Sequence, residues 1–212
     1  MRSTFGSSPL VRLLDAPAPV AAPGSGMDFA ERLSLWLNAF DAIGLQGAHQ
    51  SLRSLEALAQ PARPARAPDA AQDLRRIRSV LAKAIGQPVD TSQEGYAPWH
   101  QRHQELQRHM ETMIAPLREQ VRQAMGRVSP RLQQLAVLDA AFEQVLARRE
   151  QVLLPKAVTL LRKRCERLRA AGAQPESLAA DWRQALLAEL DLRLEPVAGL
   201  VEALDNELKN RA

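Results

Sequence analysis

Three histidines, His100, His103 and His109, lie close together in the sequence and are candidates for binding a metal ion. His100 and His103 are neighbours on a predicted helix, but His109 lies about half a turn out of phase with His100. One helix therefore cannot direct all three side chains at one ion, and no cysteine or carboxylate of matching spacing accompanies them. His103 falls on the apolar stripe of its helix. We interpret it as a buried, satisfied residue of a helix interface, and we expect no metal and no other cofactor.

The single cysteine, Cys165, is the other candidate for chemistry. It stands among Arg162, Lys163, Arg164 and Arg167, and nearby cations favour the reactive thiolate. It also continues the apolar stripe of its helix, and a free cysteine usually behaves as a small buried hydrophobic residue. No histidine or carboxylate is placed by sequence to activate it, and phosphate-binding glycine loops and Ser/His/Asp signatures are absent from the sequence. We therefore expect a protein that is not an enzyme.

Both candidates lie on a predicted hairpin of two long helices over residues 98–169, which turns back at residues 126–130. Apolar side chains recur at steps of four and three in both arms, except that Gln120 and Arg149 each interrupt the stripe once, and two such faces bury each other. The stripe of the first arm is Trp99, His103, Leu106, Met110, Met113, Leu117 and Ala124. The stripe of the second arm is Leu135, Leu138, Phe142, Val145 and Val152. The second arm is longer, so we expect other helices to cover its far end.

Composition divides the chain into regions. Residues 1–60 are predicted to form a smaller N-terminal helical region with a Pro/Ala/Gly linker at residues 16–26, and the capping box at Asp28–Glu31 starts a helix there. Residues 61–68 contain three prolines, which lack a backbone donor and restrict their neighbours, so this segment is predicted to be a stiff Pro/Arg linker. Residues 69–212 are predicted to form the bundle around the hairpin.

Two further helices belong to this predicted bundle. One begins near Asp69 and ends at Gly86, and the other begins near Pro175. The apolar stripe of the last helix continues across Pro196, which predicts a kinked but continuous helix. Because its connection to the hairpin is short, we expect it to fold back along the second arm. Its acidic groups should then partly neutralise the basic end of that arm: Glu189, Asp191, Glu195, Glu202, Asp205 and Glu207.

The fold class follows from composition and periodicity. Helix-forming Leu, Ala, Gln, Glu and Arg dominate, and β-branched residues are few. We predict an all-α protein: an elongated helical bundle built on the long antiparallel hairpin, with the C-terminal helix packing back. One cysteine excludes an internal disulfide, and no uncharged run approaches the roughly 18 residues of a membrane span. We therefore expect a cytoplasmic protein without membrane insertion.

The net charge of +4 is unevenly distributed, with basic segments at residues 61–83 and 143–170 and an acidic segment at residues 171–212. Such charge blocks bear on association. We expect a non-enzymatic helical scaffold or adaptor that binds other proteins. The alternative is a nucleic-acid-binding protein, although interleaved aromatic residues and a recognised reading motif are missing. The candidate interaction surface consists of Arg75, Arg76, Arg78, Arg162, Lys163, Arg164, Arg167 and Arg169.

Several blocks resemble a bacterial family known only as a domain of unknown function, number three-three-four-eight of that series. Residues 10–14, 29–37 and 41–43 resemble its opening, in which Trp36 and Asp41 are the most specific residues. Its later blocks resemble residues 116–118, 138–140, 149–151 and 192–197. The resemblance covers nearly the whole chain and implies no activity and no catalytic residues. The family's genes resemble neighbours of genes for flagellar-motor-like and OmpA-like envelope proteins, which implies at most a cytoplasmic partner of an envelope complex.

Overall fold

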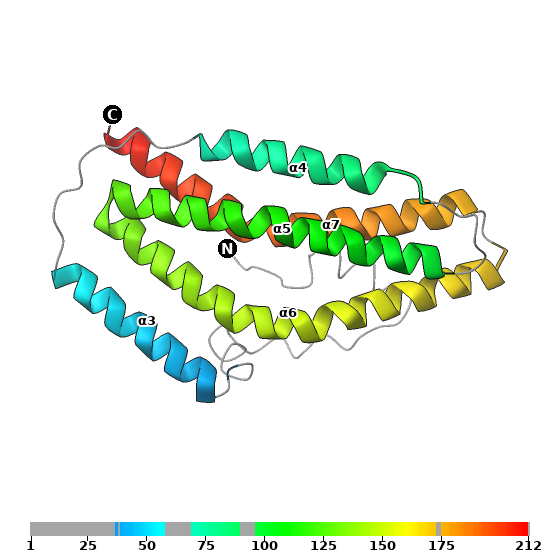
Figure 1. Ribbon diagram of the computed structural model, residues 1–212, viewed down its shortest axis with the longest axis horizontal. Coiled ribbons are helices and arrows are strands. Elements are labelled where there is room, and N and C mark those ends of the chain that lie inside the picture. Colours follow the sequence, from blue (N-terminus) through cyan, green and yellow to red (C-terminus); the bar gives the residue numbers. More distant parts are fainter. Residues whose placement is uncertain (1–36, 38, 58–68, 90–95, 173–174, 212) are drawn as a thin grey trace, which may run out of the picture. The chain divides into compact units, whose positions relative to one another are not determined.

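The computed structural model describes residues 37, 39–57, 69–89, 96–172 and 175–211. Every regular element in this part of the chain is a helix, and no strand occurs in it, which confirms the predicted all-α class. The helices are α3 (Ala39–Ala57), α4 (Ala70–Gly86), α5 (Ala97–Val128), α6 (Pro130–Ala170) and α7 (Pro175–Arg211) (Figure 1). Trp36 and the predicted capping box at residues 28–31 lie outside the described residues. So do both predicted linkers, at residues 16–26 and 61–68, and the predicted region boundaries stay a prediction.

The turn of the predicted hairpin is confirmed, since α5 ends at Val128 and α6 begins at Pro130. Ser129 caps α6, because its hydroxyl oxygen accepts a hydrogen bond from the Leu132 backbone N–H at 3.2 Å. Pro130 suits the first helical position, where no backbone donor is needed. The guanidinium of Arg211 donates to the carbonyl of Val128 and so satisfies one of the unpaired carbonyls at the end of α5.

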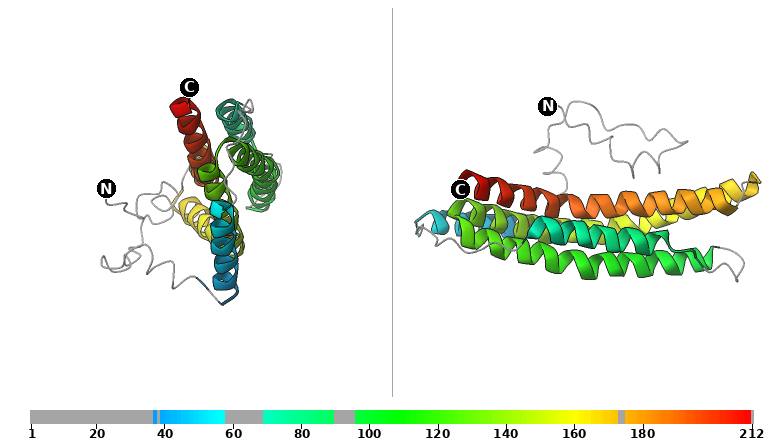
Figure 2. Two further views of the ribbon diagram at one scale, coloured as in Figure 1. Left: turned by 90° about the vertical axis from the view of Figure 1, so that its left-hand side faces the viewer. Right: turned by 90° about the horizontal axis from the view of Figure 1, so that it is seen from above.

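The described helices belong to two compact units. Unit 1 contains residues 72–117 and 153–195, so that α4 and parts of α5, α6 and α7 meet in it. Unit 2 contains α3 and residues 118–152 and 196–211. Within unit 1, α4 runs beside α5 and α7 (Figure 2). The guanidinium of Arg102 on α5 donates to the carbonyl of Ala84 on α4 at 3.1 Å, which ties these two helices together.

The core of unit 1 is built from one apolar stripe of each helix. Burying each such leucine or isoleucine stabilises the fold by about 1.5–3 kcal/mol. The stripe predicted for the last helix is confirmed, because its members in this unit are buried and α7 continues without interruption across Pro196. Fully buried residues in unit 1 are Leu81, Ile85, Leu106, Met110, Leu161, Trp182, Leu186 and Leu190.

In unit 2 the predicted register of the second arm is partly wrong. Val145 is buried as expected, but Leu135 is 38% exposed and Phe142 is only half-buried. The inward face of α6 instead carries the buried residues Leu132 and Ala136. The physical reason is that carboxylates continue this face at positions 139 and 143, where they meet arginines of α5. A register predicted from apolar residues alone turns the wrong side of α6 toward α5, because part of the contact between these helices is polar. Val152 is the last residue of the predicted stripe, and its side chain is not among those that the structure describes.

Bilayer crossing needs a long and strongly apolar helix. None of the helices in the described part of the chain has that combination of length and apolar character.

Candidate interaction surface

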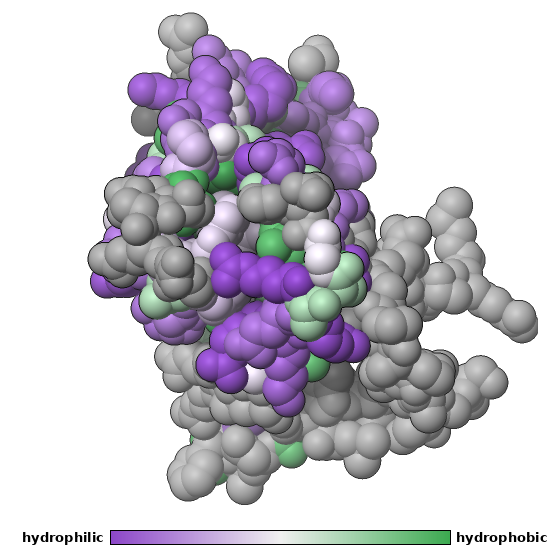
Figure 3. Space-filling model, turned by 90° about the vertical axis from the view of Figure 1, so that its right-hand side faces the viewer, coloured by the Kyte–Doolittle hydropathy of each residue, from purple (hydrophilic) through white to green (hydrophobic). Residues whose placement is uncertain are grey.

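The candidate surface is centred on the last turns of α6 in unit 1. Lys163, Arg164 and Arg167 lie three, four and seven residues after Leu160, so the four residues share one side of the helix. We call this side the Leu160 face. Lys163 and Arg167 are exposed, Arg164 is half-buried, and Leu160 is a large apolar residue that is 49% exposed. Figure 3 looks onto the side where α6 ends and α7 begins, and hydrophilic side chains cover most of its coloured surface.

The other predicted cations of this helix lie on a different side. Arg162 is 3.6 Å from Glu166, one turn further along the same helix, and both side chains are more than half exposed. Such a pair contributes about 0–1 kcal/mol. Arg169 is exposed near the end of α6. The sequence grouped these residues with the Leu160 face because they are close along the chain, but the helix separates them by its rotation.

Cys165 points inward from this segment and is buried, as predicted for a small hydrophobic residue. Burial raises the pKa of the thiol, and the charge of Asp181 adds to the increase, while Arg169 and Arg164 act in the opposite direction. The net effect is an upward shift, so the thiol stays protonated at neutral pH. The surrounding arginines therefore do not produce a reactive thiolate.

Helix α7 meets α6 through Asp181, whose carboxylate accepts a hydrogen bond from Nε of Arg164 at 3.0 Å and forms an ion pair with it. The predicted folding back of the last helix is thus confirmed. The predicted role of its acidic groups is wrong at two positions, because Asp191 pairs with Arg78 of α4 at 2.8 Å and Glu189 turns toward α5. The reason is geometric: α7 packs against three helices in unit 1, and only part of its surface faces α6.

The α4 half of the predicted surface is also exposed. Arg75, Arg76 and Lys83 are exposed on this helix, and Arg78 is exposed although it is paired with Asp191. The structure therefore places the eight predicted cations on two helices of unit 1. It brings Lys163, Arg164 and Arg167 together and leaves the α4 group on a separate helix.

A buried polar cluster lies beneath these surfaces, between α5 and α7. Glu189 is only 4% exposed, and its carboxylate accepts hydrogen bonds from Nε2 of Gln107 at 3.0 Å and from Nε of Arg193 at 3.0 Å. Burial on its own raises the pKa of Glu189, but the ring of His103, the charge of Arg193 and the amide of Gln107 outweigh it, so this pKa is lowered. The cluster holds a charged carboxylate in a fixed position against α5.

His103 is buried, 3% exposed, as predicted. The expectation that its polar atoms are satisfied is met only in part: neither ring nitrogen makes a regular hydrogen bond, but Nε2 is in polar contact with Glu189. Its Nε2 atom lies 3.4 Å from Oε2 of Glu189, which is longer than a well-formed hydrogen bond. The ring instead packs edge-on toward Trp182, which also makes an edge contact with Trp99 at a centroid distance of 5.1 Å. His103 thus belongs to an aromatic contact between α5 and α7.

The remaining histidines of the predicted helix, His100 and His109, are exposed. Across the residues that the structure describes, no group of three or more His, Cys, Asp or Glu side chains is placed to hold a metal ion.

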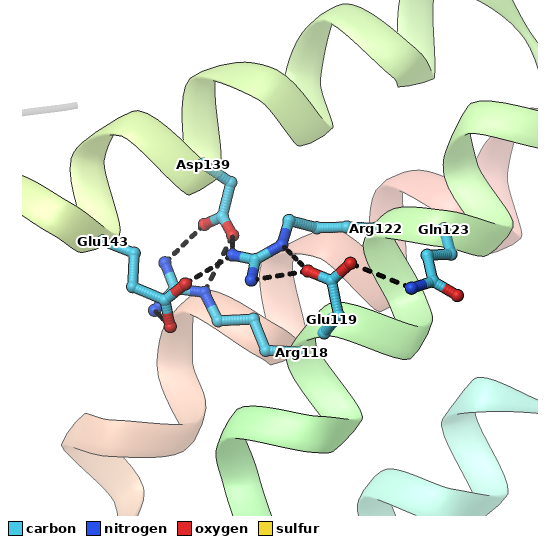
Figure 4. A network of polar contacts seen from close by, with 6 residues as sticks. All are labelled: Arg118, Glu119, Arg122, Gln123, Asp139 and Glu143. Atoms are coloured by element: carbon cyan, nitrogen blue, oxygen red, sulfur yellow. Dashed lines mark hydrogen bonds and ion pairs between the residues drawn. The ribbon is translucent and has the colours of Figure 1, made fainter. Parts of the chain in front are cut away.

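In unit 2, a network of ion pairs joins α5 to α6 (Figure 4). Arg118 binds both oxygens of Asp139 at 2.6 and 2.8 Å, and Arg122 binds Asp139 at 3.0 Å and Glu143 at 2.6 Å. The exposed side of the network is closed by Glu119, which pairs with Arg122 at 2.9 Å. Sequence reasoning missed this network. Its signal was two arginines four residues apart before the turn and two carboxylates four residues apart after it, at similar distances from Ser129.

Comparison with known proteins identifies the family. Residues 1–206 of the chain match the family model described as Protein of unknown function (DUF3348). The chain belongs to this family. The resemblance seen in the sequence is thereby confirmed over nearly the full length. No curated protein and no solved structure matches this DUF3348 chain.

Three of the blocks that carry the resemblance to DUF3348 contain members of the two polar clusters. The block at residues 116–118 includes Arg118 and the block at residues 138–140 includes Asp139, which pair with each other. The block at residues 192–197 includes Arg193, which binds Glu189. In this DUF3348 chain the first two blocks thus supply a contact between α5 and α6, and the third supplies a contact within α7.

Proposed function

We propose that this DUF3348 chain is a non-enzymatic helical scaffold or adaptor that binds another protein through exposed cations of unit 1. The observation that supports the proposal is the exposure of Lys163 and Arg167 beside the exposed Leu160. On α7, Asp181 pairs with Arg164, while Glu189 and Asp191 are engaged by α5 and α4. Lys163 and Arg167 therefore present positive charge to solvent at the α6 end.

Exposed charge of one sign favours association with a partner of opposite charge. It accelerates encounter and excludes wrongly charged partners, whereas affinity comes mainly from apolar contact and from rigidity of the binding surface. The α6 end offers rigidity because Cys165 and Leu161 anchor its inner side in the core and Arg164 is tied to Asp181. The cations of α4 offer a second positively charged surface for the same partner.

A cytoplasmic location is part of this proposal. It is supported by Cys165, a buried cysteine that carries a free thiol, since intracellular conditions keep thiols reduced. The gene neighbourhood implied by the family resemblance makes the cytoplasmic components of an envelope complex the first class of partner to test.

The experiment is a capture comparison with the full-length protein. Wild-type chain, the charge-reversal variant K163E/R167E and the control variant R127E/R131E are used as baits, and captured proteins are identified by mass spectrometry. The control changes the net charge by the same amount at two arginines of unit 2 that are also exposed.

A partner that this surface binds is captured by the wild type and the control and lost with K163E/R167E. With the purified partner, the charge reversal should weaken binding at least about tenfold, equivalent to about 1.4 kcal/mol. A purified partner that binds all three proteins equally would show that the α6 cations are not the binding surface.

A further inference from the structure

We infer that the partner of the Leu160 face is an acidic helix that presents one leucine-sized apolar residue at one end of a row of carboxylates. This inference rests on the proposed function and names the chemistry of its partner. It is carried by the arrangement of one exposed leucine and three cations on the same side of α6.

The exposure of Leu160 follows from its position on a well-packed helix. Val158, Leu161 and Cys165 on the inner side of the same turns are buried. Leu160 is rotated away from that side and remains 49% exposed. Only the covered half of the Leu160 side chain contributes to the core of unit 1. The exposed half is available to contact a partner.

The cations around Leu160 define the charge of that partner. Lys163 and Arg164 follow within one turn of the helix, and Arg167 follows within two. Arg164 is held by Asp181 at 3.0 Å, whereas Lys163 and Arg167 are exposed. Nε of Arg167 donates to the backbone carbonyl of Lys163 at 3.3 Å, which keeps these two residues together. All three cations lie on the C-terminal side of Leu160, so the complementary surface is an apolar side chain with carboxylates on one side of it.

Helical geometry then selects the form of the partner. Lys163 and Arg167 are four residues apart, which places them about 6 Å apart along the helix axis. Carboxylates four residues apart on a second helix have the same separation, so two helices lying side by side can pair both charges and bury the leucine between them.

This arrangement favours a protein over a polyanion with phosphate groups. Phosphates require only the cations, and single-stranded nucleic acid gains further affinity by stacking bases on aromatic side chains. The Leu160 face carries a leucine and no aromatic residue. An anionic membrane would bind through the same cations, but one leucine offers it little apolar area.

The test uses full-length protein and a fluorescently labelled alanine-based helical peptide with two glutamates four residues apart and one leucine three residues before the first of them. The same peptide with serine in place of leucine is the control ligand. Single-stranded oligothymidylate and phosphatidylglycerol vesicles are the competing polyanions. Binding is measured by fluorescence anisotropy for the peptides and the oligonucleotide, and by co-sedimentation for the vesicles.

L160S should weaken binding of the leucine peptide about fivefold, equivalent to about 1 kcal/mol, and should leave the serine peptide unchanged. L146S is the control, because Leu146 is an exposed leucine, 40% exposed, on the same helix. K163E/R167E should weaken both peptides, with a larger loss at low salt. L160A provides a second variant that retains helix propensity.

Several results would overturn the inference. They are the absence of measurable binding of the leucine peptide, equal effects of L160S on both peptides, or tighter binding of oligothymidylate or vesicles than of the leucine peptide. If the peptide fails while a purified partner protein still depends on Lys163 and Arg167, the proposed function stands and this inference falls. If that partner is insensitive to K163E/R167E, the proposed function itself falls.

Discussion

Removing the carboxylate of Asp139 should destabilise unit 2 more than any substitution of an exposed charge. Asp139 accepts hydrogen bonds from Arg118 at 2.6 and 2.8 Å and from Arg122 at 3.0 Å. The side chains of both arginines are 13% exposed and that of Asp139 is 11% exposed, so solvent screens these contacts only in part.

The magnitude follows from two limits. Breaking a fully buried pair costs about 3–5 kcal/mol, and breaking a surface pair costs about 0–1 kcal/mol. D139A leaves Glu143 as a remaining partner of both arginines, which reduces the loss. We therefore expect D139A to lower the free energy of unfolding by about 2–3 kcal/mol, and D139N, which keeps the shape, by about 2 kcal/mol.

The assay is urea unfolding followed by far-UV circular dichroism, with hydrogen exchange used to locate the loss. Residues 118–128 and 130–147 of unit 2 should exchange faster in D139A. The matched control is E119A, because the Glu119 side chain is 52% exposed although it pairs with the same Arg122, and its loss should stay below about 1 kcal/mol. A D139A loss no larger than that of E119A, or faster exchange elsewhere with none in unit 2, would refute the reasoning.

Three further predictions concern other parts of the protein. Since Phe142 is half-buried, F142A should lower the free energy of unfolding, measured with urea, by about 1–2 kcal/mol. A loss of about 3–5 kcal/mol, which is typical of buried phenylalanines, would support the register predicted from sequence instead. Because burial raises the pKa of the Cys165 thiol, a chromogenic disulfide reagent at neutral pH should react with native protein on the order of 100-fold more slowly than with unfolded protein, and equal rates would contradict its burial. The pKa of Glu189 is lowered on folding, so its contribution to stability is present above the unfolded-state value of about 4.3 and is lost as pH falls through the folded-state value. E189Q should therefore flatten the dependence of stability on pH in the acid range, as measured by urea unfolding at a series of pH values. An unchanged profile would show that Glu189 does not cause this dependence on pH.

The candidate surface was predictable in its residues and only partly in its geometry. The cations could be read directly from the sequence, and their exposure follows from their charge. The side of the helix on which each lies follows from helical rotation, which groups Leu160 with Lys163 and Arg167 and separates Arg162. The neutralising partners could not be read in this way, because Asp191 finds Arg78, which is 113 residues away in the chain.

Apolar periodicity predicts which apolar residues are buried, but it does not predict the two buried polar clusters. The apolar pattern placed His103 correctly in the interior. It could not reveal that Glu189 faces His103, because a carboxylate is expected at the surface unless a specific partner compensates its burial. For the same reason the predicted stripe of α6 is partly wrong, because Asp139 and Glu143 belong to the inward face of this helix.

The long helices of the bundle, the turn at Ser129 and the continuity of α7 across Pro196 could be predicted from sequence, because helix propensity, capping and apolar spacing are local properties of the chain. The identity of the charged residues is likewise given by the sequence. Which charges pair between helices and which face solvent depends on the rotation and neighbours of each helix in its unit, so these features emerge only in the folded structure. Arg118 and Arg122 are half-buried because α6 brings Asp139 and Glu143 against them. Lys163 and Arg167 are exposed, while Asp181 of α7 pairs with Arg164 and Asp191 of α7 pairs with Arg78 of α4.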